Sequence, residues 1–203
     1  CLEQEISSKR VTLGNLEQAQ LCLSRVFDAE LARQAQVEGV RYLPLSSTEC
    51  AQANRLKQTL IDNLNVQARM LPRFTPQRFE LSIEPGQAID YAGVRLMGRV
   101  DRIDIDAEHG HYVVIDYKGG IAGHDAGFDP DEQEGFRIPS KIQTLIYAQA
   151  LRGVVESARP VGALYLSYRA NEPARSIAGS FDSSMLDVTG FARSASGVNM
   201  NFE

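Results

Sequence analysis

The sequence has no tryptophan, and cysteine and histidine occur only three times each among its 203 residues. Cys1, Cys22 and Cys50 are odd in number and far apart, and no CxxC pair is present. This pattern argues against a zinc ribbon and against a closed disulfide framework. Reduced thiols in a cytoplasmic protein are therefore the expectation.

Long hydrophobic runs are also missing. No apolar segment approaches the roughly 18–20 residues that cross a bilayer, so no association with a membrane is predicted.

Basic residues are outnumbered by acidic ones. The chain has 21 lysines and arginines and 26 aspartates and glutamates, which gives a net charge of −5. A free-standing nucleic-acid-binding protein usually has a basic excess, so this class is disfavoured. An enzyme that receives nucleic acid from a neighbouring domain is not excluded, because only the field at its cleft must be favourable.

The pattern of apolar residues changes once along the chain. Apolar residues recur at helical spacing from Asn15, a candidate N-cap, to about residue 36, and again after Ser47, the candidate N-cap of a second helix. After Pro72 the pattern changes to short alternating segments. We therefore expect an N-terminal helical segment over residues 1–72, packed on a core formed by residues 73–203.

The second part of the chain is predicted to contain several strands and one helix. The strands are expected at residues 77–85, 94–104, 112–118, 161–169 and 176–182, and the helix at residues 139–153. A polar loop over residues 119–138 precedes the helix, and a loop of this length is typical of a functional or mobile segment. This order of elements indicates an α/β fold with a mixed central β-sheet flanked by helices.

Charged residues lie inside two of the apolar strands. A turn centred on residues 107–110 would place Asp101 close to Asp116 on the neighbouring strand. Asp116 and Lys118 are two residues apart, so they share a face. Two carboxylates this close repel each other unless a cation lies between them, and aspartate oxygens with a backbone carbonyl suit Mg²⁺ or Mn²⁺. An ordinary buried Asp–Lys pair that stabilises a hairpin is the alternative, because a D-x-K pattern is short and common.

The position of these charges favours a functional role. The segment 113–115 is apolar throughout, which is typical of a buried central strand, and Asp116 and Lys118 follow at its end, where sites lie in α/β sheets. A divalent ion there could polarise a phosphoryl oxygen and lower the pKa of water. Lys118 could hold the attacking water or stabilise charge on the phosphate oxygens.

Three motifs together resemble a known family. They are GRVDRID, VVIDYKGG and KIQTLIYAQAL, and in this order and spacing they resemble the RecB-type nuclease domain of the PD-(D/E)XK superfamily, in particular the nuclease module of AddB-like helicase–nuclease proteins. The resemblance covers residues 80 to about 169. It implies a restriction-endonuclease-like core and a metal-dependent DNA nuclease, an exonuclease of DNA repair and recombination. The implied partners are DNA and a helicase-type subunit or a helicase domain of the same chain.

The resemblance also implies roles for single residues. Asp101 and Asp116 match the family's ligands of Mg²⁺ or Mn²⁺, with the backbone carbonyl of Tyr117 as a further ligand, and Lys118 matches the catalytic lysine. Glu80, in RFELSIEP, resembles an acidic residue on the strand before the first metal aspartate. A solvent-facing strand residue is the alternative for Glu80.

Gln143 and Tyr147 match the helix motif that lines the family's active-site cleft. Their i, i+4 spacing places both on one helix face. Without the resemblance, ordinary polar residues on the surface would be the simpler interpretation.

The chain departs from the family in two ways. RecB-type domains usually carry an upstream helix with a histidine after a glycine, whereas His109, His111 and His124 all follow the predicted N-terminal helices. Because the first residue is Cys1 and not Met, we expect a piece of a longer chain, and the histidine motif either precedes it or is missing in this copy. A copy without it would be a catalytically inactive nuclease-fold module for DNA binding or protein assembly.

The four cysteines of AddB-like iron–sulfur clusters have no counterpart, so no cluster is predicted. The H-x-H at the hairpin turn is interpreted as a polar turn.

Overall fold

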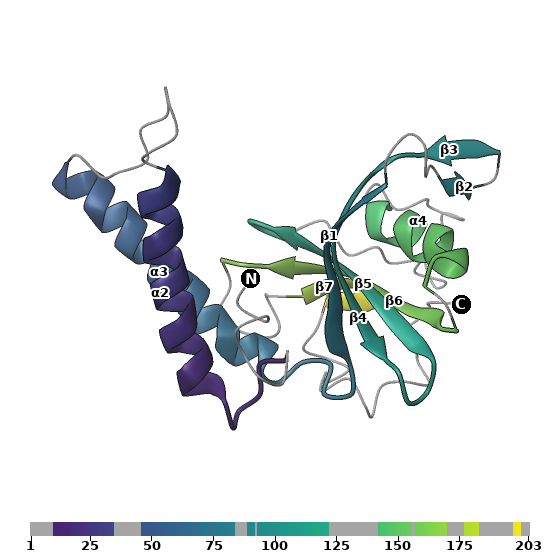
Figure 1. Cartoon of the computed structure of the whole chain (residues 1–203), viewed down its shortest axis with the longest axis horizontal. Coiled ribbons are helices and arrows are strands. Elements are labelled where there is room, and N and C mark those ends of the chain that lie inside the picture. The colour runs from purple at the N-terminus through teal and green to yellow at the C-terminus, as the bar shows by residue number, and fades with distance from the viewer. Residues whose placement is uncertain are drawn as a thin grey trace, which may run out of the picture.

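The computed structural model describes residues 10–34, 46–83, 89–91, 93–121, 142–155, 157–169, 177–182 and 197–199. Its elements are α2 (Leu16–Gln34), α3 (Ser47–Gln67), β1 (Thr75–Ile83), β2 (Ile89–Tyr91), β3 (Val94–Leu96), β4 (Gly98–Asp106), β5 (His111–Lys118), α4 (Gln143–Ala150), the 3₁₀ helix η2 (Leu151–Gly153), β6 (Arg159–Ser167), β7 (Ile177–Phe181) and β8 (Gly197–Asn199). Figure 1 shows α2 and α3 on one side of the sheet and α4 on the other. The predicted α/β class and N-terminal helices are confirmed.

Six strands form one mixed sheet in the order β1-β4-β5-β6-β7-β8. Neighbours are antiparallel except for the pairs β5–β6 and β7–β8, which are parallel. A parallel pair needs a crossover connection, and α4 lies in the connection between β5 and β6. β2 and β3 form a separate two-stranded ribbon, which extends from the sheet near α4 (Figure 1). The end of β5 thus lies between β4 and β6.

Two predicted elements have different bounds in the structure. The strand expected over residues 94–104 is two strands, β3 and β4, interrupted at Met97. Gly98, the first residue of β4, has a φ of 153°, which side-chain-bearing residues rarely adopt, so the chain passes from one sheet to the other at this glycine. The helix expected over residues 139–153 is described from residue 142 onward, and its last turn is the 3₁₀ helix η2. Most of the predicted loop, residues 122–138, lies outside the described residues.

The N-terminus of α3 is capped one residue earlier than predicted. Ser46 has extended backbone angles, its side chain accepts a hydrogen bond from the Glu49 backbone, and Glu49 in turn accepts from the Ser46 backbone. The prediction of Ser47 as N-cap is therefore wrong, because only Ser46 has a glutamate at the third helical position to complete this capping box. α2 begins directly after Asn15, as predicted, and the Asn15 carbonyl accepts from the Ala19 backbone at 2.9 Å.

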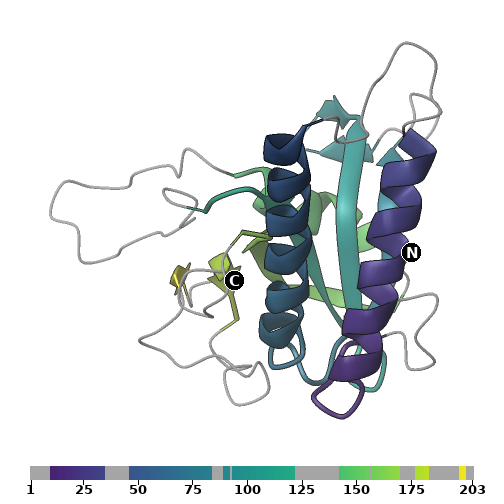
Figure 2. The ribbon, with the colours of Figure 1, turned by 90° about the vertical axis from the view of Figure 1, so that its left-hand side faces the viewer.

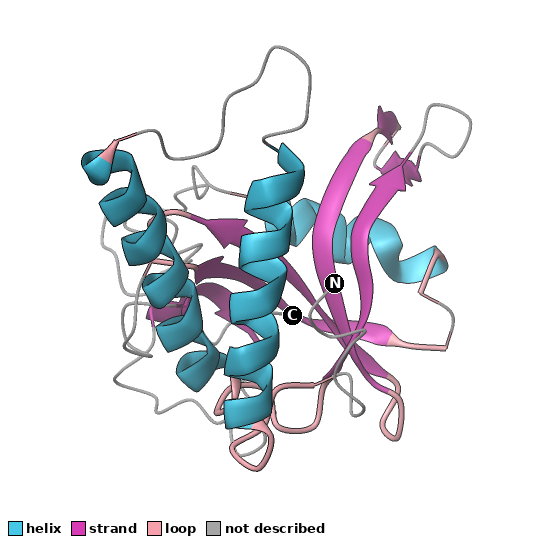
Figure 3. Ribbon diagram, turned by 60° about the vertical axis from the view of Figure 1, so that its left-hand side comes forward, coloured by secondary structure: helices cyan, strands magenta, loops and turns pink. Residues whose placement is uncertain are grey.

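Alternate residues of β5 belong to two hydrophobic cores, one on each face of the sheet. The core on the α3 side contains Val66, Met70, Leu71, Phe74, Val113 and Ile115, and the core on the α4 side contains Ile103, Tyr112, Val114, Ala148 and Leu151. Figures 2 and 3 show α2 and α3 side by side over the first of these faces. Because Val66 of α3 and the residues after it share a core with β5, the end of α3 packs against the sheet. A domain boundary at residue 72 stays a prediction.

Candidate active site

The hairpin of β4 and β5 brings Asp101 and Asp116 together. Its register pairs Arg102 with Ile115, so the next two residues along the strands are Asp101 and Asp116. Val114, two residues before Asp116, packs in the α4-side core, and both aspartates therefore lie on that face. Asp101 Oδ2 accepts a hydrogen bond from the Tyr117 backbone N–H at 2.9 Å. This side-chain bond continues the connection between the strands past the last backbone pair.

Asp116 forms an ion pair with the lysine two residues along the same strand. Its Oδ2 lies 2.5 Å from Lys118 Nζ, and the two side chains are 7% and 31% exposed. Lys118 Nζ also lies 5.8 Å from the centre of the Tyr165 ring, close enough for a cation–π contact. A buried carboxylate needs a compensating charge, which Lys118 supplies to Asp116. The amine is thus held beside the carboxylate, and the lysine side chain remains partly exposed.

The helix motif lies on the same face of the sheet. A Cβ at Gly98 of β4 would lie 2.5 Å from Tyr147 Oη, so this hydroxyl sits against the strand three residues before Asp101. Gln143, exposed, is the first residue of α4, and the next backbone N–H, that of Thr144, lies 3.5 Å from Tyr165 Oη. Tyr147 therefore reaches the strand of Asp101, and Gln143 begins the helix beside the strand that pairs with Asp116.

Glu80 lies in a kink of β1. The pairs Phe79–Arg102 and Leu81–Val100 flank it, so the register places Glu80 opposite Asp101. Its φ is +50°, unusual for a residue with a side chain, and its carboxylate lies 2.7 Å from Arg99 Nε with both side chains more than half exposed. The structure thus directs Glu80 to Arg99, and its role as a metal ligand stays a prediction.

The oxygen atoms at this position fit a hard divalent cation. In the part of the chain that the structure describes, no three His, Cys, Asp or Glu residues are grouped to hold a metal. Mg²⁺ is usually bound by only one or two carboxylates together with waters and substrate phosphates. Asp101 and Asp116 meet this requirement. The N–H and C=O of one strand residue point to the same neighbouring strand, so the Tyr117 carbonyl is directed toward β4 as well.

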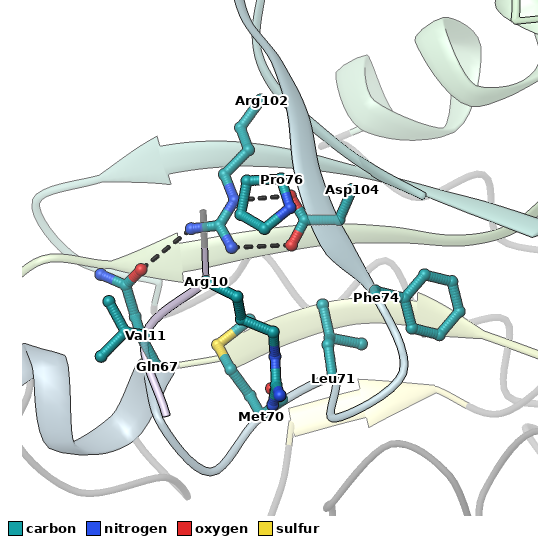
Figure 4. A pocket seen from close by; sticks show the side chains of 9 residues that line it. All are labelled: Arg10, Val11, Gln67, Met70, Leu71, Phe74, Pro76, Arg102 and Asp104. Atoms are coloured by element: carbon teal, nitrogen blue, oxygen red, sulfur yellow. Dashed lines mark hydrogen bonds and ion pairs between the residues drawn. The ribbon is translucent and has the colours of Figure 1, made fainter. Parts of the chain in front are cut away.

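A second buried charged group lies on the opposite face of β4 and was missed by the sequence analysis. Arg102, 5% exposed, donates to both carboxylate oxygens of Asp104 at 2.6 and 2.7 Å. Burial lowers the pKa of Arg102, but Asp104 and Tyr117 raise it more, so the pKa lies well above its ordinary value. The pocket beside this pair is lined by Arg10, Val11, Gln67, Met70, Leu71, Phe74, Pro76, Arg102 and Asp104 (Figure 4). The alternation of charged and apolar residues in RIDID, residues 102–106, was the available signal.

The H-x-H pair lies at the far end of the hairpin from Asp116. His109 Nδ1 lies 3.1 Å from Asp106 Oδ2, and Arg73 Nη2 lies 2.8 Å from the same oxygen. Burial raises the pKa of Asp106, but the hydrogen bonds from His109 and the charge of Arg73 together lower it below its ordinary value. The predicted polar turn is what the structure contains at residues 107–110.

The pKa of His111 predicts how stability depends on pH. Burial, and next the charge of Arg159, lower this pKa below its ordinary value of 6.5. As the pH falls, the unfolded chain then binds more protons at His111 than the folded chain does. The contribution of His111 to stability is therefore complete above about pH 6.5 and is lost as the pH falls below it. We expect the free energy of unfolding, measured with urea at pH 8.0, 6.5 and 5.5, to fall less steeply for a His111→Asn variant than for the wild type. Equal slopes would contradict this expectation.

The fold and the site define a class of α/β protein with an acidic pair and a lysine at the end of a central strand. The family model described as PD-(D/E)XK nuclease superfamily matches residues 2–194, and the chain belongs to this superfamily. Its members are generally nucleases that act on DNA and typically use divalent metal ions. The match extends over α2 and α3, beyond the segment that carries the three motifs. No curated protein matches the chain. Among the described residues, no helix is long and apolar enough to cross a membrane.

Proposed function

We propose that the chain is a RecB-type, AddB-like nuclease domain: a Mg²⁺- or Mn²⁺-dependent deoxyribonuclease of the exonuclease type, acting in DNA repair or recombination in the cytoplasm. The observation that carries the proposal is the meeting of Asp101, Asp116 and Lys118 on one face at the end of β5. Membership of the superfamily supports the assignment of these three residues to phosphodiester hydrolysis.

In this proposal Asp101, Asp116 and the Tyr117 carbonyl hold the divalent ion, with Glu80 as a further ligand. A bound ion supplies Lewis-acid chemistry, because it polarises a phosphoryl oxygen and lowers the pKa of water. Lys118, held beside Asp116, orients the attacking water or donates hydrogen bonds to the phosphate oxygens as negative charge grows on them.

The remaining predicted residues act on the substrate. Gln143 and Tyr147 lie on α4, the helix that packs on the face of the acidic pair, and would position the DNA backbone there. The net charge of −5 provides little general attraction for DNA. A helicase-type partner or domain would instead deliver the strand at a high effective concentration.

A catalytically inactive module is the second candidate. It is supported by α2 and α3, which contain no histidine, although RecB-type domains usually place one in an upstream helix. Such a module would retain the fold and bind DNA or a partner protein without cleaving phosphodiesters.

Cleavage assays on linear and closed circular DNA distinguish these candidates. The wild type with Mg²⁺ or Mn²⁺ is expected to degrade the linear form only, since an exonuclease needs an end, and EDTA should stop the reaction. A Lys118→Met variant is expected to be slower by about 100-fold, because it loses the group that orients water or stabilises charge. Absence of cleavage with either ion would favour the inactive module. Cleavage of circular DNA would contradict the exonuclease assignment.

A further inference from the structure

A buried polar network lies directly behind the two aspartates, on the α3 face of the sheet. Its centre is Arg102, whose Nη1 donates to Gln67 Oε1 and to Tyr117 Oη, both at 2.9 Å, while its other nitrogens bind Asp104. Figure 4 shows the guanidinium between the side chains of Gln67 and Asp104. One side chain thus joins α3, β4 and β5.

The network continues along α3 to the next strand. Gln67 Nε2 donates to Asn63 Oδ1 at 3.2 Å, and Asn63 Nδ2 donates to the backbone carbonyl of Ser167 at 2.8 Å. Ser167 pairs with Lys118 in the parallel register of β5 and β6. The polar face of α3 therefore bonds directly to β4 and β6, and it reaches Tyr117 of β5 through Arg102.

Tyr117 connects this network to the site. Its hydroxyl accepts from Arg102 on the α3 face, and its backbone N–H donates to Asp101 Oδ2 at 2.9 Å. Its carbonyl is directed to the same side as its N–H. The position of the Tyr117 backbone thus determines both where the Asp101 carboxylate lies and where the carbonyl points.

Burying an Arg–Asp pair is costly because both charges lose their hydration. Well-packed apolar side chains in its place often stabilise a fold as much as the pair does. Groups that orient metal ligands, in contrast, strongly affect metal affinity. The placement of this costly pair one residue from Asp101 and in contact with Tyr117 favours a role in orientation over a role in stability alone.

We propose that Arg102, Gln67 and the Tyr117 hydroxyl form a positioning network that holds the Asp101 carboxylate and the Tyr117 carbonyl in place for a divalent ion. Through Gln67, the N-terminal helix α3 thereby sets the metal affinity of the site. This inference rests on the proposed function, because it assigns supporting residues to the same metal site.

The test compares Mn²⁺ binding to the metal-free 203-residue chain, by calorimetry without DNA, among four variants and the wild type. Gln67→Met and Tyr117→Phe each remove one contact of Arg102 and leave its pair with Asp104 intact. Each is expected to raise the dissociation constant for Mn²⁺ by about tenfold. Gln58→Met makes the same change on the same helix at an exposed glutamine that bonds Asp62, and it should bind Mn²⁺ like the wild type. Asp116→Asn should abolish binding.

The outcomes separate the inference from the proposed function. Binding that depends on Asp116 but stays within twofold of the wild type in Gln67→Met and Tyr117→Phe would overturn the positioning network and leave the proposed function standing. Wild-type protein that does not bind Mn²⁺ would overturn both. A merely structural network would lower the melting temperature of the metal-free variants without changing the dissociation constant, and that result also counts against the inference.

Discussion

An Asp116→Asn substitution is expected to slow metal-dependent DNA cleavage by about 1,000-fold or more and to leave the protein folded. The change keeps the size of the side chain but removes one of the two carboxylates at the end of β5. A bound ion supplies several kcal/mol of transition-state stabilisation, and losing roughly 4 kcal/mol corresponds to this factor. Degradation of end-labelled linear DNA in Mn²⁺, followed over time, measures the effect.

The same substitution is expected to keep or raise the melting temperature of the metal-free protein. Asp116 is 5% exposed and lies opposite Asp101, so replacing it relieves repulsion between like charges. Lys118 loses its partner but is 31% exposed and remains hydrated. Addition of Mn²⁺ should raise the melting temperature of the wild type by mass action and leave that of the variant unchanged. Lost activity without lost stability is the result expected of residues kept for function.

A second Asp–Lys pair provides the matched control. Asp28 and Lys57 join α2 to α3 with an oxygen–nitrogen distance of 2.7 Å, away from β5. Asp28→Asn should leave both the cleavage rate and the Mn²⁺-induced shift as in the wild type, since exposed pairs contribute little. Wild-type cleavage by Asp116→Asn would contradict the assignment of this residue as a metal ligand.

The hairpin could be predicted because its determinants are local. Apolar residues that alternate around the turn at residues 107–110 define both strands and their register, and this register places Asp101 opposite Asp116. The positions of Gln143 and Tyr147 over the sheet came from the family resemblance, since helical spacing alone states only that they share a face.

The support behind the site could not be predicted, because its partners are distant in sequence. Gln67 and Arg102 are 35 residues apart, and Asn63 and Ser167 are 104 apart, so no local pattern joins them. The apolar residues at helical spacing after Ser47 predicted a helix and gave no sign that its polar residues reach the sheet. The left-handed backbone of Glu80, which turns its carboxylate to Arg99, likewise has no signature in a strand-like sequence.

Among the glycines that the structure describes, Gly179 in β7 is the one where an added Cβ would meet another atom most closely. Its φ is +124°, and a Cβ there would overlap the Ala163 carbonyl oxygen and lie 3.0 Å from the Leu164 Cα. Both are backbone atoms of the paired strand β6, which cannot rotate away as a side chain could. A Gly179→Ala variant is therefore expected to lose about 4 kcal/mol of unfolding free energy or more, or roughly 10 °C in melting temperature for a chain of this size. Urea denaturation of the purified chain measures it.

Gly153→Ala is the matched control for this prediction. Gly153 lies at the exposed end of η2, and no atom lies within 4 Å of a Cβ built there, so the change should alter stability by less than about 1 kcal/mol. β6 carries Tyr165 beside Asp116 and Ser167 beside Lys118, so a shift of β6 caused by Gly179→Ala should also weaken Mn²⁺ binding in whatever fraction of the protein stays folded. If Gly179→Ala and Gly153→Ala unfold at the same urea concentration, the close approach of β7 to β6 is wrong. The position of β6, whose Tyr165 ring contacts Lys118, would then be wrong as well.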